Sequence, residues 1–141
     1  MKIFVLVTSL LIFTQIIHAA VDYKFIRTIR DHIKECVKTL PKCKDQPTDP
    51  LIRADVWYCA LSKYGMDYKN PDEVKKTYLQ NCRKASVNPV DTKYCEKSVH
   101  ECMEKAKQTP GFDKQKNIDI IACTLRRGII EKSELAKEKF T

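Results

Sequence analysis

Seven cysteines are the residues of this chain with the clearest capacity for chemistry. A thiol can serve as a nucleophile, a metal ligand or one half of a disulfide, and the redox compartment decides among these roles. All seven lie at or after Cys36, well beyond a hydrophobic N-terminal stretch. In an oxidising secretory compartment this number favours a disulfide framework over metal binding or thiol catalysis.

The other candidate sites for catalysis or metal binding lack essential residues. His100-Glu101-Cys102 has no second histidine one turn along, which a zinc-binding helix requires. Asp31-His32 reverses the His-Asp order of a calcium-dependent phospholipase, and the three glycines are too scattered to form a calcium loop. No serine lies in a Gly-x-Ser-x-Gly nucleophile elbow. We therefore expect no enzyme: no catalytic residue, no bound metal and no cofactor.

The N-terminal residues predict the compartment. Lys2 precedes an almost uninterrupted apolar run from Ile3 to Ile17, which is the pattern of a secretory signal peptide. This run is shorter than the roughly 20 apolar residues of a transmembrane helix, and no second hydrophobic segment follows it. Residues 1–19 are the predicted signal peptide, with cleavage after Ala19 to within one residue. We expect residues 20–141 to form a single secreted domain without stable membrane insertion.

The chain is basic, with a formal net charge of +8 that loss of Lys2 would lower by one. Such a charge can attract anionic membranes or polyanions through salt-sensitive contacts. However, the basic residues are interspersed with acids, and Lys75-Lys76, Arg126-Arg127 and Lys137 to Lys139 are short clusters. Clusters of this kind are more often solvated surface than recognition patches. Secretion also argues against a nucleic-acid partner.

Apolar residues recur every three or four positions, which predicts amphipathic helices. Prolines in the segment 41–50 predict a constrained loop, and Asn70-Pro71 and Asn88-Pro89 each place a capping Asn before a first-turn Pro. The predicted helices span residues 22–40, 51–64, 71 to at least 82, 89 to at least 106, and 113–127, with a short sixth at 129–139. No sustained period-two alternation supports a sheet. The predicted fold is an all-α, disulfide-stapled bundle of five or six short helices.

Two cysteines on one predicted helix restrict the disulfide pattern. Cys95 and Cys102 lie seven residues apart, about 10 Å along the helix axis, which exceeds the Cα separation of about 7 Å that a disulfide permits. Each must therefore reach another helix. Cys43 differs from the other six because it lies in the proline-rich loop between two lysines. We assign it to an interchain bridge; a Cys36–Cys43 bridge that leaves another cysteine free is the alternative.

The pairing of the other six cysteines is open to several connectivities that sequence alone does not resolve. If the loop at 41–50 folds back, the first two helices are antiparallel neighbours, which favours Cys36 with Cys59. The remaining pairs that we favour are Cys82 with Cys102 and Cys95 with Cys123.

Four segments and the cysteine spacings resemble a known family. They are FTQIIHA at 13–19, TLPKCKDQPTDPL at 39–51, DVWYCA at 55–60 and NIDIIACTLRRG at 117–128. Over nearly the whole chain this sequence resembles the fire ant venom allergens, specifically the second and fourth allergen group. The resemblance implies a helical fold related to insect odorant- and pheromone-binding proteins, secretion in venom, recognition by host IgE and a homodimer linked through Cys43. Residues 64–76 and the tail after Ile130 depart from the family, so IgE epitopes are not carried over.

A related fold suggests a carrier of a small hydrophobic ligand, such as a pheromone or a venom alkaloid. Helices pinned by disulfides can surround a cavity without collapsing into it. The candidate lining residues are Ile29, Ile33, Val56, Trp57, Tyr78, Val99, Met103, Ile121 and Leu125. The alternative, which is the stronger one for each residue taken singly, is that all of them are ordinary core. A basic venom protein that binds anionic membranes or polyanions without a cavity is the second functional hypothesis.

Overall fold

The computed structural model describes residues 21–42 and 45–137, and five α-helices form within them. The helices are α2 (Tyr23–Thr39), α3 (Ala54–Lys63), α4 (Pro71–Ala85), α5 (Pro89–Lys107) and α6 (Lys114–Arg126), with the 3-10 turns η1 (Pro50–Ile52) and η2 (Glu134–Lys137). Across these two ranges β pairing is limited to one isolated bridge, between Ser86 and Ser133. The predicted all-α class is confirmed. The predicted signal peptide at 1–19 and Cys43 lie outside the described residues.

Capping side chains set where the helices begin. Asn70 accepts a hydrogen bond from the Asp72 amide at 3.0 Å, and Asn88 accepts one from the Asp91 amide at 2.9 Å. Each of these caps satisfies an amide that has no partner within its helix. In both helices a proline follows the cap, where its missing N–H costs nothing. The two predicted Asn-Pro helix starts are therefore confirmed.

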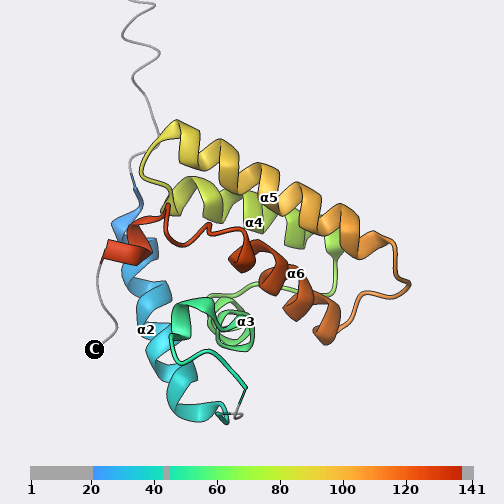
Figure 1. Cartoon of the computed structure of the whole chain (residues 1–141), viewed down its shortest axis with the longest axis horizontal. Helices are drawn as coiled ribbons and strands as arrows, with labels where there is room; N and C mark the ends of the chain where they lie inside the picture. The colour runs from blue at the N-terminus through green and yellow to red at the C-terminus, as the bar shows by residue number, and fades with distance from the viewer. Residues whose placement is uncertain (1–20, 43–44, 138–141) are drawn as a thin grey trace, which may run out of the picture.

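The helices pack around one core. Helix α2 lies against α3, α4 lies antiparallel to α5 along one side of the molecule, and α6 packs on both α5 and α3 (Figure 1). The apolar faces of α2 and α3 supply the most deeply buried side chains, including Ile29, Ile33 and Val56, which are inaccessible to solvent. In the described part of the chain, no helix combines the length and hydrophobicity needed to cross a bilayer.

The predicted sixth helix is wrong. Within residues 129–137 the chain forms turns and the four-residue η2. Gly128 ends α6 with a φ of 70°, a left-handed conformation that stops a helix. Beyond it the Ser133 hydroxyl donates to the Ile130 carbonyl at 2.7 Å and competes with helical pairing. This C-terminal segment, residues 129–137, instead packs across the core between α2 and the start of α5 (Figure 1).

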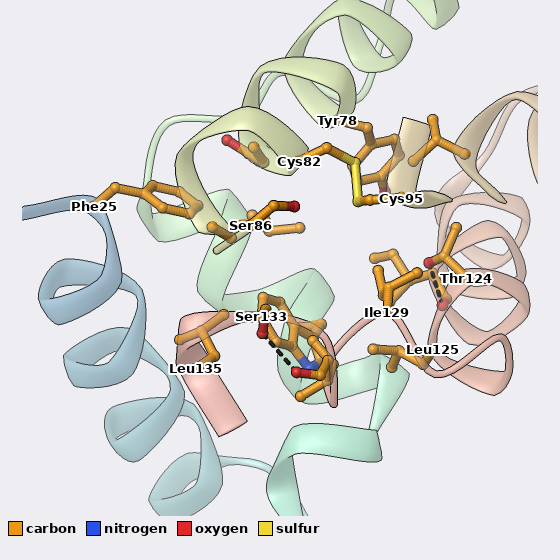
Figure 2. Close-up of a pocket in the computed structure, with 17 residues that line it drawn as sticks. Phe25, Tyr78, Cys82, Ser86, Cys95, Thr124, Leu125, Ile129, Ser133 and Leu135 are labelled. Atoms are coloured by element: carbon orange, nitrogen blue, oxygen red, sulfur yellow. Dashed lines mark hydrogen bonds between the residues drawn. A yellow bond between two sulfur atoms is a disulfide. The ribbon is translucent and has the colours of Figure 1, made fainter. Parts of the chain in front are cut away.

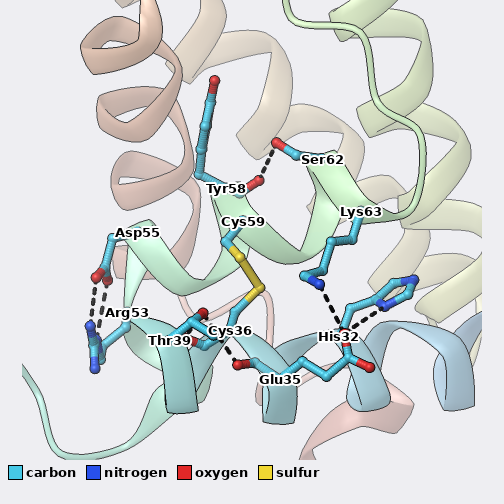
Figure 3. The surroundings of a disulfide bond; sticks show 10 residues. All are labelled: His32, Glu35, Cys36, Thr39, Arg53, Asp55, Tyr58, Cys59, Ser62 and Lys63. Carbon is cyan, nitrogen blue, oxygen red and sulfur yellow. Dashed lines mark hydrogen bonds and ion pairs between the residues drawn. A yellow bond between two sulfur atoms is a disulfide. The ribbon is translucent and has the colours of Figure 1, made fainter. Parts of the chain in front are cut away.

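The first disulfide joins α2 to α3 through Cys36 and Cys59, whose Cα atoms are 6.0 Å apart, as the sequence favours (Figure 3). Two ion pairs flank this bridge. Lys63 Nζ lies 3.0 Å from Glu35 Oε2, and the buried Arg53 guanidinium lies 2.5 Å from Asp55 Oδ2. Burial raises the pKa of the Asp55 carboxyl, but the Arg53 hydrogen bond and charge outweigh it, so this pKa lies below its usual range. Asp55 therefore stays ionised, and its ion pair with Arg53 is maintained at the junction of η1 and α3.

The other two predicted disulfides are wrong. The structure joins Cys82 to Cys95 and Cys102 to Cys123, with Cα separations of 5.6 and 5.8 Å, instead of Cys82 to Cys102 and Cys95 to Cys123. The reason is that a short turn joins antiparallel α4 and α5. Cys82, near the end of α4, therefore lies opposite Cys95, which is the α5 cysteine nearer the turn. Cys102 lies about 10 Å farther along α5, where it meets α6 instead of α4. The prediction that Cys95 and Cys102 each reach a different helix is confirmed.

Candidate functional site

A cavity of about 80 Å³ lies between α4, α5, α6 and the C-terminal segment. Its wall is mainly apolar and includes the ring of Trp57. Figure 2 shows the Cys82–Cys95 disulfide and the rings of Phe25 and Tyr78 at the same wall. An engineered cavity of about 150 Å³ is large enough to bind benzene. The resting cavity therefore has room for only a few heavy atoms, and a longer ligand must displace part of the wall.

Five of the nine candidate residues lie at this wall, which they reach from four helices. They are Trp57, Tyr78, Val99, Ile121 and Leu125.

The other four candidates are buried core residues and do not line this cavity. Ile29, Ile33 and Val56 are 0% exposed and Met103 is 4% exposed, but none of them lines the cavity. Their side chains fill the contacts between helices. Helical periodicity identifies the buried face of a helix and does not distinguish the part of that face left uncovered by its neighbour.

Several lining residues were not among the candidates from the sequence. Phe25 and Leu61 lie four residues from Ile29 and Trp57 respectively, on the same helical faces, so the apolar period would have included them. Ile129, Ile130, Ser133 and Leu135 also line the cavity, but they come from turns and carry no periodic signal.

The C-terminal segment closes one side of the cavity and is held from α2. The Arg30 guanidinium Nη2 donates to the backbone carbonyls of Glu134 and Leu135, each at 3.3 Å. Leu135 is 2% exposed, so its side chain is anchored in the core. The Ser86–Ser133 bridge ties the same segment to the end of α4. These contacts hold the segment against α2 and the end of α4.

The cavity wall carries no net charge. None of the lining residues in the described ranges is acidic or basic. Burial raises the pKa of the Tyr78 phenol well above its ordinary value, and burial likewise raises the pKa of Tyr68, which stacks on Tyr58 with ring centroids 4.4 Å apart. The tyrosine at the wall therefore stays neutral at physiological pH. The site has the chemistry of an apolar pocket and lacks that of an ion-binding site.

A second, polar groove of about 360 Å³ runs beside the Cys102–Cys123 disulfide between α5 and α6. Its most prominent cation, Lys116, donates to the carbonyls of Thr109, Pro110 and Gly111. The ammonium group therefore closes the α5–α6 loop on itself. We assign this lysine a structural role.

The candidate catalytic and metal-binding residues are not brought together. Cys102 is oxidised in a disulfide, and neighbouring His100 is exposed. His32 Nδ1 lies 4.0 Å from Glu35 Oε2. Within the ranges that the structure covers, no group of three His, Cys, Asp or Glu side chains is arranged to hold a metal ion.

Comparison with known proteins gives several full-length relatives. The chain is 45% identical to Venom allergen 2 of Solenopsis saevissima over 140 residues, 99% of this chain and all of that protein. It is also 45% identical to Venom allergen 2 of Solenopsis richteri over 120 residues, 84% of this chain and all of that protein. Venom allergen 4 of Solenopsis invicta is 37% identical over 140 residues, with the same coverage as the first. No protein-family model matches the chain.

Proposed function

The chain belongs to the family of fire ant venom allergens 2 and 4, and from this premise we propose that it is a secreted venom protein and allergen that carries a small hydrophobic ligand. The cavity under the C-terminal segment is the single observation that carries the ligand proposal. Its wall is apolar, uncharged and stapled by the Cys82–Cys95 disulfide. Kinship with insect odorant- and pheromone-binding proteins stays a prediction.

The disulfide cross-links explain how a small domain can maintain this cavity. A cavity normally costs stability because its lining atoms lose packing partners. Each of the three disulfides offsets part of this cost by lowering the entropy of the unfolded chain, by about 3 kcal/mol for loops of this length. The helices around the cavity therefore tolerate imperfect packing. A transported apolar molecule would complete that packing.

A cavity-filling substitution tests the carrier proposal. We expect Ala85→Leu, which adds a side chain at the cavity wall, to weaken binding of N-phenyl-1-naphthylamine at least tenfold because the added carbons occupy the ligand's place. Fluorescence titration measures this probe. Ala106→Leu is the matched control, since Ala106 is equally half-buried but lies outside this cavity. Equal binding by both variants, or no binding by the unmodified protein, would contradict the carrier proposal.

We propose further that Cys43 links two copies of the chain. The three disulfides use six of the seven cysteines, and Cys43 is the remaining one. A loop cysteine outside the intrachain framework of a secreted protein is available for an intermolecular bridge. The resemblance to the allergen group favours the same arrangement.

Electrophoresis tests the interchain bridge. We expect the secreted protein to run at twice its chain mass without reductant and at the mass of one chain with it. Cys43→Ser should run as a single chain under both conditions, because it removes the bridging sulfur. A covalent dimer that persists in Cys43→Ser would contradict the assignment.

We propose no catalytic role, in keeping with the oxidised state of Cys102. The second functional hypothesis, binding to anionic membranes or polyanions, has one supporting observation: Val87 and Val90 are 42% and 76% exposed at the start of α5, beside exposed Lys93. Several nearby charges are already paired, including Arg83 with Glu96 at 2.8 Å. Salt-sensitive binding to phosphatidylserine vesicles, together with no probe binding, would favour this function over the carrier.

A further inference from the structure

One hydroxyl in the cavity wall is not used by the protein. Ser86 caps the end of α4 and is only 4% exposed. Its backbone amide donates to the Cys82 carbonyl at 3.0 Å, but within the described residues its side-chain oxygen forms no hydrogen bond. Figure 2 shows this hydroxyl projecting from the end of α4 toward the cavity. A buried hydroxyl without a partner is costly, so an incoming polar atom would be stabilised there.

The other polar side chains that line the cavity beside Ser86 do not offer an equivalent group. The Ser133 hydroxyl donates to the Ile130 carbonyl at 2.7 Å, and the Thr124 hydroxyl donates to the Ile121 carbonyl at 2.8 Å (Figure 2). The Trp57 indole N–H donates to the Leu51 carbonyl at 2.8 Å. The Asn81 amide nitrogen and the Tyr78 hydroxyl also lack a hydrogen-bond partner among the described residues, but both atoms are enclosed by protein atoms, so a ligand reaches them only if the wall rearranges.

We propose that Ser86 determines which ligands the cavity accepts: neutral molecules with a short apolar chain and one oxygen atom that pairs with the Ser86 hydroxyl. This inference rests on the proposed carrier function and deepens it. A hydroxyl both donates and accepts, so alcohols, aldehydes, ketones and esters all qualify. Their apolar chains would lie against the Cys82–Cys95 disulfide and the aromatic rings.

The same wall excludes protonated amines. Burial of an ammonium ion requires a compensating carboxylate or several acceptors. No acidic side chain lines the cavity within the described ranges, and one hydroxyl does not replace the hydration of a full charge. The two ligand types predicted from the sequence are a pheromone and a venom alkaloid. The cavity therefore favours a neutral oxygenated compound over an alkaloid in its cationic form.

Ligands matched in chain length test the proposal in three variants. Pentane, 1-pentanol and pentylamine each compete with N-phenyl-1-naphthylamine for the unmodified protein, for Ser86→Ala and for the control Ser98→Ala. We expect Ser86→Ala to weaken 1-pentanol binding about fivefold, the effect of one neutral hydrogen bond, and to leave pentane binding unchanged. Ser98→Ala should change neither preference, because Ser98 is equally a buried serine (1% exposed) but does not line the cavity. At pH 7 pentylamine should bind at least tenfold more weakly than 1-pentanol.

Each outcome separates this proposal from the carrier function on which it rests. If neither pentane nor 1-pentanol displaces the probe, the carrier function fails. If both bind and Ser86→Ala affects them equally, or pentylamine binds as well as 1-pentanol, the carrier stands and the role of Ser86 is overturned. Ser86→Thr keeps a hydroxyl and should retain the selectivity for 1-pentanol, which guards against a general packing effect of Ser86→Ala.

Discussion

Removal of the Cys102–Cys123 disulfide will lower the free energy of unfolding by about 3 kcal/mol. This bridge closes a loop with a sequence separation of 21 residues and holds α6 on α5. Without it the unfolded chain gains conformational entropy, and the native α5–α6 contact must depend on packing alone. Small domains have a total stability of about 5–15 kcal/mol, so the loss is a large fraction of the whole. Urea unfolding of Cys102→Ala/Cys123→Ala, followed by circular dichroism in a Cys43→Ser background, measures it.

The single variant Cys102→Ala provides the control for connectivity. It leaves one newly free thiol, and the structure predicts that this thiol is Cys123. Alkylation without reduction, followed by peptide mass mapping, identifies the labelled residue. Label on Cys82 would instead indicate the Cys82–Cys102 pairing that the sequence favoured, and would contradict the structure.

Replacement of Trp57 by alanine will cost about 3–5 kcal/mol of stability, the usual range for a buried aromatic residue. The side chain is 7% exposed, its ring lines the cavity, and its indole N–H satisfies the buried Leu51 carbonyl. Alanine would enlarge the cavity and leave that carbonyl without its partner. Because Trp57 is the one tryptophan of the chain, urea unfolding is followed by circular dichroism instead of fluorescence.

Two variants calibrate this prediction. Tyr23→Ala removes an aromatic ring that is 57% exposed in the first turn of α2, so it should change stability by less than about 0.5 kcal/mol. Trp57→Phe keeps an apolar ring but loses the N–H donor, and it should fall between the two. A loss below about 1 kcal/mol for Trp57→Ala would mean that the ring is not part of the stabilising core.

The helices were predictable because their signals are local. A capping Asn followed by Pro fixes the start of α4 and α5 regardless of what packs against them. The apolar period along α2 likewise identifies Ile29 and Ile33 as buried. These properties depend on residues within one or two turns, and the sequence presents them directly.

The disulfide pairs and the cavity depend on distant geometry, and the prediction was weaker there. Whether Cys82 meets Cys95 or Cys102 is decided by the register between α4 and α5, which the turn between them sets. Whether Trp57 or Val56 faces the cavity depends on how fully the neighbouring helix covers each of them. The C-terminal segment supplies Ile130 and Leu135 through turns. Turns have no period from which burial can be inferred.

The three disulfides each connect helices that follow one another in the chain, and this has a consequence for digestion. None of these three bridges crosses the segment between Cys59 and Cys82. One peptide-bond cut there, for example by trypsin beside exposed Lys69, divides the chain into two pieces that no described covalent bond joins. Whether the two pieces separate then depends on their noncovalent contacts alone, although all three disulfides remain intact.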